Sequence, residues 1–131
     1  MNTDPMQILL VESKQAHQNR IREALEAGSP STTVHVFAHF EDAQTYLSNT
    51  VPDVFILGLD DQHYQVIDHI TQLKLPTFDI PFPVIVLADN DNPDMAITLL
   101  GHGVQTLLIK SETVFALLPY TVNNAVQVWK Q

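Results

Sequence analysis

The 131-residue chain contains no cysteine. It can therefore form no disulfide and offers no thiolate to a metal ion, and we expect a cytoplasmic protein. Basic residues are also scarce, because six Lys and Arg stand against fifteen Asp and Glu, which gives a formal net charge of −9. A surface of this sign repels a phosphate backbone, so the composition disfavours nucleic acid as a partner.

Long apolar runs are missing as well. No stretch approaches the roughly 18 residues of a membrane-spanning helix, and the first residues carry no signal-peptide pattern. A hydrophobic content of 45% with 16% charged residues is that of an ordinary globular protein. The length predicts one domain over residues 1–131 with a core of its own and no membrane partner.

Short apolar stretches alternate with helix-forming segments along the whole chain. Strands are expected at 7–11, 33–37, 53–58, 84–88 and 106–109. Helices are expected at 14–27, 41–47 and 64–75, from Asn92 to Gly101, and from a cap at Ser111 to about Gln131. Five strand–helix repeats predict an α/β fold, with a parallel sheet covered by helices on both faces.

In such a sheet the ligand site lies beyond the carboxyl ends of the strands. The residues expected at that edge are Glu12 and Ser13 after the first strand, Gly58 ending the third, Ala88 and Asp89 after the fourth, and Lys110 after the fifth. The six histidines are spread over the sequence, and His35 and His39 fall on a strand and the loop after it. That spacing does not converge on a metal, so no metal site is expected.

Four segments together resemble the CheY-like receiver domains of response regulators. These segments are Ile8–Ser13, Pro52–Gly58, Pro83–Ala88 and Leu107–Ser111, in this order on the first, third, fourth and fifth strands. The resemblance covers nearly the whole chain. It implies a flavodoxin-like (βα)5 three-layer sandwich with a parallel five-stranded sheet of order 2-1-3-4-5.

The resemblance also implies a phosphorylation site that this sequence has lost. The family's reaction uses an aspartate nucleophile, Mg²⁺ held by acidic residues, and a lysine and a hydroxyl that bind the phosphoryl group. Only Glu12 and Lys110 match that pattern, whereas Ser13 replaces an acid, Gly58 the nucleophile and Ala88 the hydroxyl. We therefore expect a degenerate pseudo-receiver with no catalytic residue, no metal and no cofactor.

Three features leave alternatives open. Lys110 is expected to form an ion pair with Glu12, Asp60 or Asp89, although it could bind an anion instead. Asp60 or Asp61 could be a shifted phosphoacceptor, and the defunct site could hold a small ligand.

The last helix carries an apolar band that is wider than one sheet face requires. Its candidate interface residues are Leu118, Val122, Val126 and Trp129. Pro119 is expected to kink this helix or to shift its start. By the resemblance, the surface of the fourth helix, fifth strand and last helix serves self-association or docking.

The sequence as a whole predicts a phosphorylation-independent interaction or dimerisation module of bacterial-type two-component signal transduction. It is not expected to be an enzyme. Its partner would be a signalling protein, a covalently attached output domain or a second copy, and the chain could be the N-terminal part of a longer signalling protein.

Overall fold

The computed structural model describes residues 5–29, 31–59, 65–74 and 79–131, in which five strands alternate with five helices. The strands are β1 (Gln7–Val11), β2 (Thr33–Phe37), β3 (Val54–Gly58), β4 (Val84–Ala88) and β5 (Thr106–Ile109). The helices are α1 (Gln15–Gly28), α2 (Phe40–Leu47), α3 (Val66–Leu73), α4 (Pro93–Gly101) and α5 (Glu112–Trp129).

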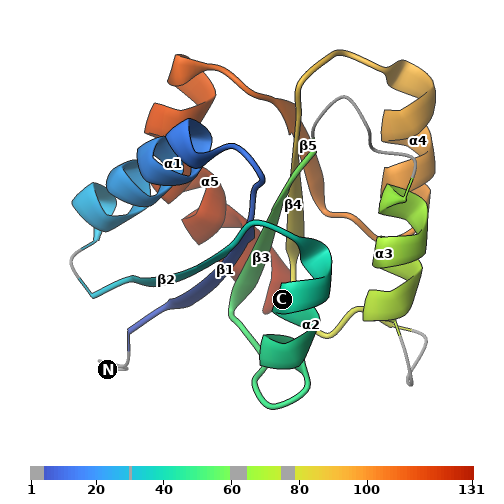
Figure 1. Cartoon of the computed structure of the whole chain (residues 1–131), viewed down its shortest axis with the longest axis horizontal. Coiled ribbons are helices and arrows are strands. Elements are labelled where there is room, and N and C mark those ends of the chain that lie inside the picture. The colour runs from blue at the N-terminus through green and yellow to red at the C-terminus, as the bar shows by residue number, and fades with distance from the viewer. Residues whose placement is uncertain (1–4, 30, 60–64, 75–78) are drawn as a thin grey trace.

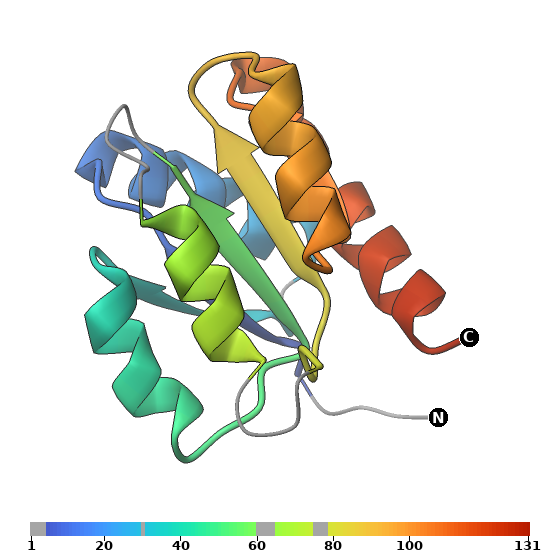
Figure 2. The same cartoon turned by 90° about the vertical axis from the view of Figure 1, so that its right-hand side faces the viewer.

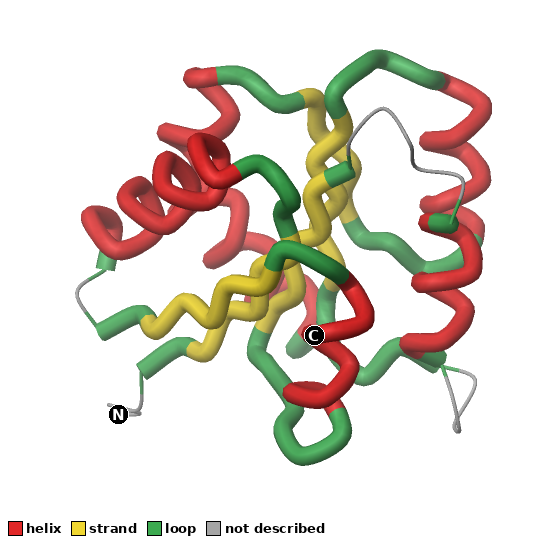
Figure 3. Tube along the Cα trace, viewed as in Figure 1, coloured by secondary structure: helices red, strands yellow, loops and turns green. Residues whose placement is uncertain are grey.

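The strands form one parallel sheet of order β2-β1-β3-β4-β5, which confirms the predicted fold class. Helices α1 and α5 cover one face of the sheet, and α2, α3 and α4 cover the other (Figures 1 and 2). Because all five strands run in the same direction, their carboxyl ends meet at one edge, where loops lead into the helices (Figure 3).

Each face of the sheet has its own apolar core, because successive strand residues point to opposite faces. In β1, Leu9 and Val11 belong to the core beneath α2, α3 and α4, whereas Ile8 and Leu10 belong to the core beneath α1 and α5. Both cores need apolar residues from the same strand. For this reason β1 reads as a continuous apolar run instead of an alternating one.

Polar side chains cap two helices as the sequence predicts. The Asn92 side chain accepts a hydrogen bond of 3.1 Å from the Met95 amide at the start of α4. The Ser111 hydroxyl accepts one of 3.0 Å from the Val114 amide at the start of α5. These caps set where α4 and α5 begin, after the loops that follow β4 and β5.

The apolar band of α5 corrects one prediction. Leu118, Val122 and Val126 are only 0%, 2% and 5% exposed and lie in the core of the α1–α5 face. These residues were predicted to form an interface because the sheet alone was expected to cover α5. In the structure, α5 packs on both the sheet and α1. They are therefore unavailable to a partner, while Trp129 remains 45% exposed.

Helix α5 starts where its predicted cap at Ser111 places it. Helix α5 runs from Glu112 to Trp129 with Pro119 inside it, so the proline does not move its start. Helix α3 spans Val66–Leu73, and the expected ends at 64 and 75 fall outside the described residues. No helix in the described part of the chain is long and apolar enough to cross a membrane.

Candidate functional site

The carboxyl edge of the sheet holds one enclosed ion pair. Glu12 follows β1 directly and is 0% exposed, and its Oε1 lies 2.8 Å from the Nζ of Lys110, whose side chain is 4% exposed. The other carboxylate oxygen, Oε2, accepts a hydrogen bond of 3.0 Å from the Lys14 backbone amide. A buried carboxylate needs both an opposite charge and hydrogen bonds, and Glu12 receives both here.

The Glu12 carboxylate also fills the space beside Gly58. A β-carbon added to Gly58 would collide with Glu12 Oε1 and would lie 3.0 Å from Glu12 Cδ and 3.3 Å from the Val11 carbonyl oxygen. The position at which the resemblance places an aspartate side chain is thus occupied by the carboxylate of Glu12, the residue that follows β1.

Asp89, the residue after β4, completes the charged cluster. Its Oδ1 lies 3.2 Å from Lys110 Nζ, and its Oδ2 lies 3.4 Å from Lys14 Nζ. Partial burial by itself raises the pKa of Asp89, but the hydrogen bond and charge of Lys110, with those of Lys14, outweigh burial and lower that pKa. The Asp89 carboxyl is therefore held in its charged form.

The structure thus places Lys110 between Glu12 and Asp89, two of its three candidate partners. The third candidate, Asp60, lies outside the described residues, as does Asp61. Of the other predicted site positions, Ser13 is exposed at the surface and Ala88 contributes only a methyl group.

These residues do not fit Mg²⁺. That ion requires several oxygen ligands in near-octahedral geometry. Here the enclosed carboxylate is already paired with Lys110, and Gly58 adds no oxygen from a side chain. Among the described residues, no group of three or more His, Cys, Asp or Glu side chains is arranged to hold a metal ion.

Two further side chains join this cluster without having been predicted from the sequence, Lys14 just before α1 and His17 within it. Lys14 contacts Asp89, and the His17 Nδ1 lies 3.9 Å from Glu12 Oε1. Their positions in the sequence could have indicated this. Lys14 and His17 follow Glu12 by two and five residues, at the start of the helix that begins at the carboxyl edge of the sheet.

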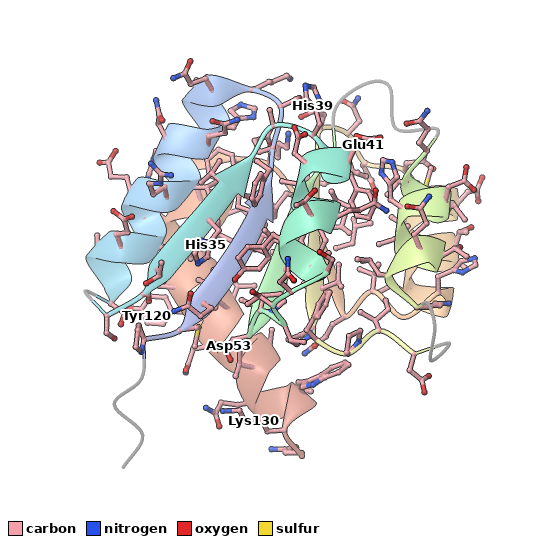
Figure 4. The ribbon with its side chains drawn as sticks, turned by 60° about the horizontal axis from the view of Figure 1, so that its bottom comes forward. His35, His39, Glu41, Asp53, Tyr120 and Lys130 are labelled. Atoms are coloured by element: carbon pink, nitrogen blue, oxygen red, sulfur yellow. The ribbon has the colours of Figure 1, made fainter. Side chains whose placement is uncertain are left out.

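Beside Gly58 lies a small cleft of about 170 Å³ between the first turns of α2 and α3. Its polar lining includes Ser13, His39, Glu41 and His69. Figure 4 shows His39 and Glu41 where α2 begins. The two histidines are thirty positions apart in the sequence, so their shared cleft could be found only from the fold.

His69 is held firmly in that cleft. Its ring stacks on Phe40 with centroids 4.1 Å apart and planes at 12°, and its Nε2 lies 3.7 Å from Glu41 Oε1. Burial lowers the pKa of His69, and the opposing charges of Glu41 and Asp68 only partly offset this. The folded state therefore favours the neutral imidazole.

No model of a known protein family matches the chain, and no curated protein matches it. Solved structures do match. A phosphorylated cyanobacterial phytochrome response regulator is 22% identical, with 97% of this chain and 95% of that chain covered and a TM-score of 0.76. The chain has the fold of a response-regulator receiver domain.

Two further receiver-fold structures match over almost the same extent. An orphan response regulator of H. pylori is 16% identical, with 95% of this chain and 99% of that chain covered and a TM-score of 0.78. A response regulator from Thermotoga maritima is also 16% identical, with 94% and 98% covered and a TM-score of 0.79. The receiver fold thus extends over nearly the whole chain.

Proposed function

We propose that the chain is a phosphorylation-independent receiver domain that acts as a protein-interaction module in bacterial-type two-component signalling in the cytoplasm. One observation carries this proposal. The side-chain position at the end of β3 is a glycine, and the space beside it is filled by the carboxylate of Glu12, which is paired with Lys110. A receiver fold with no nucleophile at this position has kept the scaffold without the group that would accept a phosphoryl moiety.

The surroundings of Gly58 support the same proposal. Ala88 has no hydroxyl to bind a phosphoryl oxygen, and Ser13 has no carboxylate to bind a metal. Restoring the reaction would need several substitutions at once, because a nucleophile, a metal site and a hydroxyl contribute jointly. The chain is therefore proposed not to be an enzyme.

An interaction surface is supported by apolar side chains on the edge strand β5 and on α4 and α5, which both contact it. Helix α4 buries Leu99 in the core but leaves Ile97 and Leu100 71% and 49% exposed. Ile109 of β5 is 41% exposed and Trp129 of α5 is 45% exposed. Large exposed apolar side chains on neighbouring elements support the proposal of a protein contact.

The occupant of this surface is proposed to be a second copy of the chain or an attached output domain. Apolar side chains supply the contact area, so the association should persist at high salt. The four apolar side chains named above carry no charge, so their contact does not by itself require a basic partner.

Intact-mass spectrometry tests the loss of phosphorylation. The protein is incubated with acetyl phosphate and Mg²⁺ beside a receiver domain that has an aspartate at the position of Gly58. We expect the control to gain a phosphoryl group and this chain to gain none. A gain that disappears in Asp60→Asn or Asp61→Asn would replace the proposal with a receiver phosphorylated at a shifted aspartate.

A further inference from the structure

Glu12, directly after β1, and Gly58, at the end of the neighbouring strand β3, form a matched pair. The Glu12 side chain is fully enclosed, which costs free energy for a charged group unless its surroundings compensate for it. Compensation comes from Lys110 Nζ at 2.8 Å and from the Lys14 amide at 3.0 Å. The absence of a side chain at Gly58 supplies the space, since even a single β-carbon there would collide with Glu12 Oε1.

We infer that Glu12 is a built-in anionic ligand of Lys110, and that Gly58 is the residue that makes room for it. The carboxylate occupies the position that an external anion would need in order to reach the Lys110 ammonium group. This contact closes the site against small anions from solution and keeps the carboxyl ends of β1, β3 and β5 in one arrangement.

Three other charged or titratable groups face the same carboxylate cluster. Asp89 is the second anion at Lys110, and Lys14 binds the outer oxygen of Asp89. His17 lies 3.9 Å from Glu12 Oε1 on the side of α1, where its ring also packs against Phe115 with centroids 5.6 Å apart. The Glu12 carboxylate is therefore enclosed by Lys110 after β5, the Lys14 backbone amide before α1 and His17 of α1, and it fills the inner position of the cluster.

The inference deepens the proposed function, because it explains how the scaffold remains ordered without a phosphoryl group. It also predicts a latent anion site. Removing the Glu12 side chain leaves Lys110 buried with Asp89 as its remaining partner, and leaves an empty space next to Gly58. A small carboxylate from solution should enter that space and replace the lost group.

Chemical rescue of Glu12→Ala tests this inference. Thermal unfolding is followed in increasing sodium acetate, with sodium chloride at equal ionic strength as the reference. We expect the melting temperature of Glu12→Ala to rise with the logarithm of the acetate concentration once this exceeds the dissociation constant, by about 3–5 °C when acetate is about tenfold above that constant. The parent should show no rise beyond that in chloride, because Glu12 already occupies the site.

The double variant Glu12→Ala/Lys110→Met is the matched control, since it has the same space without the ammonium group. Rescue that is absent in Glu12→Ala, or equally large in the double variant, would overturn the inference. This outcome is separable from the proposed function, because acetate rescue does not involve phosphorylation. A parent phosphorylated at Asp60 would end the proposed function and leave the rescue result intact.

A second measurement applies if Glu12→Ala is too unstable to purify. Glu12→Asp keeps the charge but withdraws the carboxylate from Gly58 by one methylene group. Adding Gly58→Ala should then lower the melting temperature less in Glu12→Asp than in the parent, because the collision is relieved. Equal losses in the two backgrounds would overturn the pairing of Glu12 with Gly58.

Discussion

Gly28, the last residue of α1, packs directly against Pro119 in the middle of α5. A β-carbon on Gly28 would lie 2.5 Å from Pro119 Cβ and 2.6 Å from Pro119 Cγ. The two helices therefore approach closely at this point because one of them has no side chain there. The contact also shows how a proline inside α5 is used, since its ring is a packing surface for α1.

Gly28→Ala should destabilise the protein by about 1–3 kcal/mol, since a methyl group has no room beside Pro119. The matched variant is Gly101→Ala at the end of α4, where an added β-carbon meets no atom within 4 Å. That variant should be neutral or stabilising by up to about 1 kcal/mol, because alanine is the better helix former. Urea unfolding of both variants measures the difference, and equal effects would contradict the packing argument.

Gly58→Asp should not restore phosphorylation and should lower stability by about 1–3 kcal/mol near neutral pH. The new side chain collides with Glu12 and brings a second carboxylate beside it, and both effects disfavour the folded state. Ser13→Asp, which adds the same charge at an exposed position, is the control and should cost less. Thermal unfolding with and without Mg²⁺ checks both variants. A Gly58→Asp protein more stable than the parent would show that Lys110 lacks a sufficient partner.

Shortening a side chain in the middle of α5 should affect stability more than shortening one at its C-terminal end. Leu118→Ala should cost about 2–5 kcal/mol, because Leu118 is fully buried between α5 and the sheet. Trp129→Ala should cost no more than about 1 kcal/mol while weakening self-association, because Trp129 is 45% exposed. Sedimentation velocity over a concentration series compares the parent with Trp129→Ala. A parent that stays monomeric at high concentration would remove self-association and leave a different protein as the partner.

Acidification should destabilise the protein partly through His69. Burial lowers the pKa of His69 in the folded state, so the unfolded chain takes up the proton first. The stability contribution of neutral His69 is complete above the unfolded pKa of about 6.5 and is lost as the pH falls from there toward the folded pKa.

Melting temperatures measured between pH 7.5 and pH 5 check this expectation. His69→Gln should show a smaller loss over that range than the parent. His39→Gln, which removes an exposed histidine from the same cleft, should retain the parent's pH dependence. If His69→Gln lost as much melting temperature between pH 7.5 and pH 5 as the parent, the pH dependence could not be attributed to His69.

Much of the architecture follows from local sequence. The apolar strands, such as 84–88, and the caps at Asn92 and Ser111 are short-range signals, and a parallel sheet follows from the alternation of strands and helices. The replacement of a nucleophile by Gly58 is also visible in the sequence, because it concerns a single position at a strand end.

Other features depended on contacts between distant segments. The sequence placed Leu118, Val122 and Val126 in an excess apolar band, but it could not show that α1 would cover them. It identified Gly58 as a missing side chain, but only the register of β1 with β3 shows that Glu12 fills the space left by that residue. The order of strands and helices determined the fold. Each strand and helix is specified by residues that are close together in the sequence. The tertiary structure alone decided which charges meet and which apolar surfaces stay open, because these depend on side chains brought together from separate strands and helices.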